Sequence, residues 1–136
     1  MNEQITEVIA RGILFKNKEI VLCKSVAGGH YFLPGGHVEF GEKAEDALQR
    51  EFVEETGEKI KVVKFVGAFE NSFSDKYIHH EVNLVFLIES SSEKIICKES
   101  HIVYEYLNKE EFKNANFLPK FFKEVILKFW NDREIF

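Results

Sequence analysis

Residues 33–57 read LPGGHVEFGEKAEDALQREFVEETG, a pair of glycines followed by a stretch with the apolar spacing of a helix. On a helical wheel of ~100° per residue, Leu48 and Phe52 fall within one stripe that should face the rest of the protein. This spacing predicts a helix from about Lys43 to Thr56. Gly57 is expected to end it, because glycine readily adopts the left-handed conformation of a helix cap.

Three carboxylates share this apolar stripe or border it. Glu51 and Glu55 fall between the apolar positions, and Glu54 lies beside them, whereas Arg50 falls on the side that is expected to be solvated. Burying an unpaired carboxylate costs several kcal/mol, and one large apolar side chain offsets only ~1.5–3 kcal/mol of that. A cation must therefore lie against these glutamates. One lysine would neutralise only one of the three, whereas carboxylates at positions i, i+3 and i+4 are hard oxygen ligands for Mg²⁺ or Mn²⁺.

The glycine pair before the helix completes a setting for phosphate chemistry. Gly35 and Gly36 allow a backbone carbonyl to approach a metal or a phosphate closely. A metal, a glycine turn and a carboxylate helix together favour metal-assisted phosphoryl transfer or hydrolysis.

Residues 36–58 resemble the signature of the Nudix hydrolases. The residues that match its seven fixed positions are Gly36, Glu42, Arg50, Glu51, Glu54, Glu55 and Gly57. The one departure is Glu58, where the family usually has an apolar residue, and the next apolar residue here is Ile60. The resemblance implies a single domain over residues 1–136, of class α/β (α+β), with an α/β/α sandwich around a mixed sheet.

The resemblance also implies roles for individual residues. Glu51, Glu54 and Glu55 would hold divalent metal ions, Mg²⁺ or Mn²⁺, with the Gly35 carbonyl as a further ligand. Arg50 would orient these carboxylates rather than react. The implied reaction is hydrolysis of a nucleoside diphosphate linked to another moiety, in which water attacks one phosphorus and a glutamate takes the proton.

The general base is left open by the sequence. In the family it is either a glutamate of the signature or an acid from a later loop or strand. The downstream candidates are Glu70, Glu81, Glu89 and Glu99. Glu81 stands out because it opens an apolar strand and resembles a His-Glu pair of related sequences; the alternative is a solvated acid at a strand end.

Candidate substrate contacts lie beside the glycines and further downstream. Gly36 and His37 are positioned to meet a phosphate, although His37 also fits an exposed loop residue. Phe73 and Tyr77 are candidates to stack on a base, as are Phe69 and Phe117, with core packing as the alternative for each aromatic ring. We expect a small nucleotide substrate: a nucleoside triphosphate, an oxidised nucleotide or an ADP-ribose-like compound. The alternative from another class is a non-catalytic Nudix-fold sensor or regulator.

Strand-like runs flank the helix. The predicted strands are Glu7–Phe15, Ile20–Cys23, Tyr31–Leu33, Ile60–Phe69, Ile78–Ile88 and Ile102–Leu107. A helical turn is predicted over Glu110–Lys113, and a last helix from Pro119 to about Asp132. Trp130, Ile135 and Phe136 would offer an apolar edge to a second copy, so a homodimer is possible.

Composition excludes several classes. The chain has 136 residues, which suits one domain, and its net charge of 18 − 23 = −5 disfavours a nucleic-acid partner. Cys23 and Cys97 lie 74 positions apart, which fits neither a disulfide framework nor a zinc site and suits a reducing cytoplasm. No signal peptide or membrane span is expected, so a cytoplasmic location is predicted.

Overall fold

The fold is described from a computed structural model that covers residues 3–97 and 100–134, with side chains up to residue 132. The strands are β1 (Gln4–Lys16), β2 (Glu19–Ser25), β3 (Tyr31–Phe32), β4 (Gly35–His37), β5 (Lys61–Ser74), β6 (Ile78–Glu89) and β7 (Ile102–Leu107). The helices are α1 (Ala44–Thr56), α2 (Lys109–Asn114) and α3 (Lys120–Glu134).

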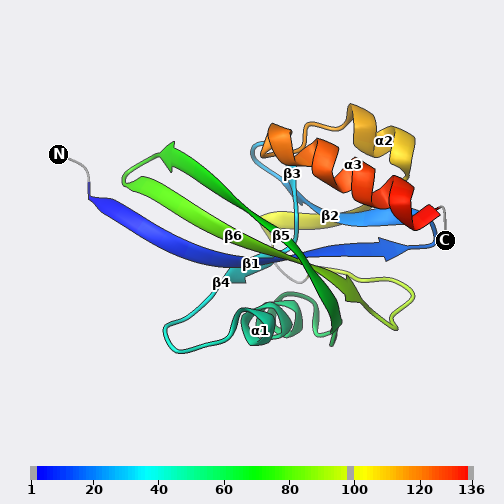
Figure 1. Cartoon of the computed structure of the whole chain (residues 1–136), viewed down its shortest axis with the longest axis horizontal. Helices are drawn as coiled ribbons and strands as arrows, with labels where there is room; N and C mark the ends of the chain where they lie inside the picture. The colour runs from blue at the N-terminus through cyan, green and yellow to red at the C-terminus, as the bar shows by residue number, and fades with distance from the viewer. Residues whose placement is uncertain (1–2, 98–99, 135–136) are drawn as a thin grey trace.

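Strand β1 organises the sheet. The strand order is β3-β2-β1-β6-β5, with β4 paired to β1 and β7 paired to β2. β1 runs parallel to β6, and the other pairs are antiparallel, so the sheet is mixed. Helix α1 lies on one side of this sheet and α2 and α3 lie on the other (Figure 1). The expected α+β architecture with helices on both sides of a mixed sheet is confirmed.

Each side of the sheet has its own apolar core. The buried residues of the α1 side are Ala10, Leu14, Val21, Cys23, Ala47, Leu48, Phe52, Ile60, Phe86, Ile88, Ile95 and Tyr104. Those of the side that carries α2 and α3 are Ile13, Ile20, Leu22, Leu33, Phe69, Val85, Leu107, Phe112, Phe117, Phe122, Ile126 and Trp130. Alternation along β1 and β6 divides their side chains between these two cores, as a pleated strand requires.

Helix α1 forms as its sequence predicts. Leu48 and Phe52 are fully buried, and Gly57 ends the helix with φ 78°, its N–H bonded to the Val53 carbonyl at 2.8 Å. After the helix, Ile60 takes the buried position in place of Glu58. Its backbone N–H and carbonyl both bond to the Gln49 side chain, at 2.7 and 2.6 Å, so the helix and the start of β5 are clamped together.

Two expectations on local structure are wrong. Gly35 and Gly36 lie in strand β4 rather than in a turn, because β4 pairs with residues 9–11 of β1. A Cβ on Gly35, whose φ is 152°, would lie 2.0 Å from the Ala10 carbonyl oxygen, so only glycine allows this close pairing. Trp130 is 3% exposed and therefore forms no surface edge.

Trp130 instead packs inside the second core. Its ring lies 5.0 Å from that of Phe15 and 6.0 Å from that of Phe112. Ile135 and Phe136, the other members of the expected apolar edge, lie outside the described residues. Over residues 3–97 and 100–134, no helix has both the length and the apolar character needed to cross a membrane.

Candidate active site

Arg50 is the centre of the polar cluster at α1. Its Nε and Nη2 donate to the two carboxylate oxygens of Glu42 at 2.9 and 3.0 Å, and Nη2 also donates to the His37 carbonyl at 3.0 Å. Its Nη1 donates to Glu51 at 3.1 Å and contacts Glu54 at 3.4 Å. The hydrogen bond to Glu42 is the main cause that raises the pKa of Arg50. The Arg50 side chain is 26% exposed, and its guanidinium contacts carboxylates of both the loop and the helix.

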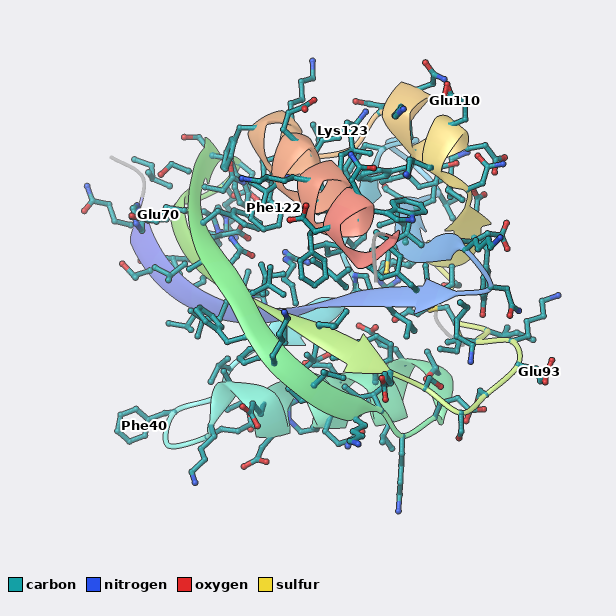
Figure 2. The ribbon with its side chains drawn as sticks, turned by 45° about the vertical axis from the view of Figure 1, so that its right-hand side comes forward. Phe40, Glu70, Glu93, Glu110, Phe122 and Lys123 are labelled. Atoms are coloured by element: carbon teal, nitrogen blue, oxygen red, sulfur yellow. The ribbon has the colours of Figure 1, made fainter. Side chains whose placement is uncertain are left out.

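The loop between β4 and α1 is held by the same cluster. Glu42 accepts a hydrogen bond from the backbone N–H of Glu39 at 3.0 Å, besides the two from Arg50. Arg50 is the largest cause that lowers the pKa of the Glu42 carboxyl. Phe40, at the tip of this loop, is fully exposed and points away from the molecule (Figure 2).

Gly36 leaves the space in which the Glu51 side chain lies. A Cβ at Gly36 would be 2.2 Å from the Glu51 Cδ and 2.5 Å from its Oε2. Gly36 of β4 and Glu51 of α1 are thus in direct contact.

Glu55, four positions after Glu51 on α1, contacts strand β7. The hydroxyl of Tyr104 donates to Glu55 Oε2 at 2.7 Å. Tyr104 is 8% exposed, and burial is the main cause that raises its pKa. The pKa of the neighbouring Cys23 thiol is also raised, first by burial and then by the charge of Glu55.

The carboxylates fit a hard divalent cation by their chemistry. Glu51 and Glu54 both contact Nη1 of Arg50, and Gly35 lies in the nearby strand β4. Oxygen donors of this kind are the ones that Mg²⁺ and Mn²⁺ prefer. As the side chains stand, the described residues contain no group of three His, Cys, Asp or Glu close enough to hold an ion.

A cavity of about 580 Å³ lies on the face of β1 and β4 opposite to Glu51 and Glu54. Its lining residues are Arg11, His30, Phe32, Leu33, Phe69, Asn71, Phe73, Glu81, Asn83, Phe117, Leu118 and Pro119. Arg11 pairs with Gly35 in the β1–β4 ladder and donates from Nη1 to the Leu33 carbonyl at 2.9 Å. The wall of the cavity is thereby one strand away from the signature glycines.

Arg11 and Asn83 form a buried polar pair in this wall. Arg11 Nε donates to Asn83 Oδ1 at 2.9 Å, and Asn83 is fully buried. Burial is the main cause that lowers the pKa of Arg11, and the nearby Glu81 opposes it. Neither Arg11 nor Asn83 was expected at a site, although each is a polar residue inside an otherwise apolar strand, which is the signal that reveals it.

The predicted aromatic contacts divide between the cavity and the hairpin tip. Phe69, Phe73 and Phe117 all line the cavity. Tyr77 instead lies at the turn between β5 and β6, where its N–H bonds to Asp75 Oδ1 at 2.8 Å.

The downstream acids have different surroundings. Glu81 lines the cavity and accepts a hydrogen bond from Asn71 at 3.4 Å. Glu70 contacts His80 Nε2 at 2.8 Å, Glu89 is exposed at the end of β6, and Glu99 lies outside the described residues.

Two histidines contact Glu7 on β1. His37 Nε2 lies 3.2 Å from Glu7 Oε1, and His79 Nδ1 lies 3.1 Å from Oε2. The other nitrogen of His79 lies 2.8 Å from Asp75, and its ring stacks on Phe73 at 4.3 Å.

Comparison with known proteins identifies the family. The family model described as the NUDIX domain matches residues 6–128. The chain is 32% identical over 126 residues to the ADP-ribose pyrophosphatase of Methanocaldococcus jannaschii, a match that covers 89% of this chain and 70% of that protein.

Solved structures share the fold at lower identity. The MutT protein of Bacillus halodurans has a TM-score of 0.74 at 21% identity, covering 89% of this chain and 82% of that one. The MutT protein of Methanosarcina mazei has a TM-score of 0.70 at 18% identity, covering 98% and 99%. With the family match spanning most of its length and the complete glutamate signature around Arg50, this chain belongs to the Nudix hydrolase family.

Proposed function

We propose that this Nudix hydrolase is a metal-dependent pyrophosphohydrolase that cleaves a nucleoside diphosphate linked to another moiety. The observation that carries the proposal is the cluster of Glu42, Glu51 and Glu54 around Arg50. An aromatic cavity lies on the other face of β1 and β4, one strand away from Gly35. The substrate we expect is a small nucleotide, a nucleoside triphosphate or an ADP-ribose-like compound. The similarity to the ADP-ribose pyrophosphatase of Methanocaldococcus jannaschii supports this class.

In this proposal the ion is Mg²⁺ or Mn²⁺, and Glu51, Glu54, Glu55 and the Gly35 carbonyl hold it. When bound, the ion offsets the negative charge of the phosphoryl oxygens. Arg50 keeps Glu51 and Glu54 in place through Nη1. Gly36 and His37 border the path of the phosphates, since they follow Gly35 in β4.

The proton of the attacking water goes to Glu51 or Glu54. Both are on α1, beside the proposed ion, and a carboxylate is a competent general base at neutral pH. Glu81 is the alternative base, and its place in the cavity with Asn71 also suits contact with the substrate. A cytoplasmic location and a homodimer remain predictions from the sequence.

The test is a phosphate-release screen over nucleoside triphosphates and diphosphate-linked nucleosides, with and without Mg²⁺. We expect turnover only with the metal, and a loss of at least ~100-fold in Glu54→Gln and in Glu55→Gln. Glu45→Gln is the matched control, because Glu45 is exposed in the first turn of the same helix. Near wild-type rates in both site variants would contradict the metal assignment. No turnover on any substrate would favour a nucleotide-binding regulator instead.

A further inference from the structure

The cavity presents two neighbouring side chains of opposite hydrogen-bonding character. Glu81 and Asn83 are two positions apart in β6, so their side chains leave the same face of the strand about 6.6 Å apart. Both line the cavity. A molecule bound in the cavity would therefore meet the hydrogen-bonding groups of both side chains.

Asn83 offers a donor, and Arg11 fixes this orientation. Arg11 Nε donates to Asn83 Oδ1 at 2.9 Å, and an arginine side chain has no acceptor that would suit the flipped amide. Asn83 Nδ2 then has no partner, and among the side chains of residues 3–97 and 100–132 it is the one buried nitrogen or oxygen without a hydrogen bond. A buried donor without a partner is unfavourable, and because Asn83 lines the cavity, an acceptor on a ligand there would satisfy it.

Glu81 offers an acceptor beside this donor. An ionised carboxylate accepts hydrogen bonds and donates none, and Glu81 already accepts one from Asn71 at 3.4 Å. The remaining acceptor capacity suits an N–H group of a ligand. The complementary ligand edge thus carries an acceptor that faces Asn83 and, next to it, a donor that faces Glu81.

The walls beside this polar pair are aromatic. Phe69 and Phe117 are buried on the cavity, and Phe73 lies at its more exposed side. Aromatic rings in a cavity favour a flat heterocycle, since stacking adds to the burial of apolar surface.

We propose that this cavity binds a nucleobase by its lactam edge, with a ring carbonyl oxygen at Asn83 Nδ2 and the adjacent ring N–H at Glu81. Guanine, hypoxanthine and uracil carry this edge. Adenine carries the reverse order, an amino group beside a ring nitrogen acceptor, and would oppose donor to donor and acceptor to acceptor. The inference rests on the proposed function for the nucleotide nature of the ligand and adds the class of base. Of the two substrate types proposed above, it favours a nucleoside triphosphate with a lactam base over an ADP-ribose-like compound that carries adenine.

The primary test measures binding without catalysis. Inosine 5′-diphosphate and adenosine 5′-diphosphate differ at this edge and share the sugar and phosphates, so their dissociation constants are compared by calorimetry without metal. We expect the inosine compound to bind between about 5- and 150-fold more tightly, the range that corresponds to one unpaired buried group. Uridine 5′-diphosphate, titrated in parallel, distinguishes a purine site from a pyrimidine site with the same edge.

The double variant Asn83→Asp with Glu81→Gln reverses the donor and the acceptor. It should invert the preference in favour of the adenosine compound. Phe73→Leu is the matched control, since it removes a stacking ring and should weaken both ligands equally. Should the double variant not fold in a thermal melt, Glu81→Gln alone serves, with loss of the preference as its expected result.

The outcomes separate this inference from the proposed function. Tight binding of the inosine compound with no hydrolysis of any nucleotide would support the base assignment and reject the enzymatic proposal. Three results in an enzyme that hydrolyses nucleotides would overturn the base assignment. These are equal dissociation constants for the two diphosphates, tighter binding of the adenosine compound, and no binding of either diphosphate. A Glu81→Gln variant that lowers kcat for both bases equally, with the preference intact, would also overturn it and make Glu81 the general base.

Discussion

Replacing Gly36 by alanine tests whether the position of Glu51 controls activity. The added Cβ would lie 2.2 Å from Glu51 Cδ, whereas ordinary contact begins at 3.4 Å, so the carboxyl group must move by about 1.2 Å. The atoms in the way belong to the far end of a flexible side chain, so the fold has an easy response. The Glu51 carboxylate, as the proposed metal ligand, has no such easy response. It must move away from Gly36 and give up its 3.1 Å hydrogen bond to Arg50.

We expect Gly36→Ala to lower kcat/KM by about 100-fold, the loss that a misplacement of about 1 Å causes in an active site. The free energy of unfolding of this variant should change by less than ~1 kcal/mol. Alanine is favoured over glycine in a strand by about that amount, which offsets the cost of moving the Glu51 side chain. Initial rates with Mg²⁺ and urea unfolding measure the two quantities. Gly67→Ala is the control, because a Cβ at Gly67 in β5 meets nothing within 4 Å. Activity of Gly36→Ala within threefold of the parent would refute the role of this contact.

Two further predictions concern buried and titrating groups. Tyr104→Phe removes the 2.7 Å hydrogen bond to Glu55 and should lower the free energy of unfolding by about 1.5–3 kcal/mol in urea titrations; an unchanged value would show that Glu55 does not depend on it. The pKa of His79 is raised, first by Glu7 and then by Asp75, so its protonated form stabilises the fold below its ordinary pKa near 6.5. This stabilisation is lost as pH rises through the raised pKa of the folded state. His79→Gln should flatten that part of the pH profile of the melting temperature, and an unchanged slope would exclude His79 as its source.

The parts of the site that depend on local spacing were predictable from the sequence. The helix that carries Glu51 and Glu54 follows from its apolar period and from Gly57, and the structure places both as expected on α1. The long strands follow in the same way from β-branched and aromatic runs. Gly35 and Gly36 mislead because glycine weakens strands locally, whereas pairing with β1 decides their conformation.

Contacts that depend on the length of a side chain or on the register between distant strands could not be predicted from the sequence. A wheel position gives the direction in which a Cβ points, but the long side chain of Arg50 carries its guanidinium back to Glu42, eight positions earlier. Arg11 and Asn83 meet only because β1 and β6 pair in parallel with a register that no local pattern indicates. The core position of Trp130 likewise depends on how α3 packs against Phe15.

The parallel pairing of β1 with β6 has a consequence for the order in which the chain folds. Gln4 faces Ile78 and Leu14 faces Ile88, so every pair in this ladder joins residues 74 positions apart. During synthesis, more than half of the 136 residues must therefore be made before β1 can pair with β6, its longest partner strand. Pairings of such high sequence separation close large loops and are slow to form. Until residues 78–89 emerge, β1 has β2 and β4 as its strand neighbours and α1 packed on one face, while the edge that later pairs with β6 stays open to other chains.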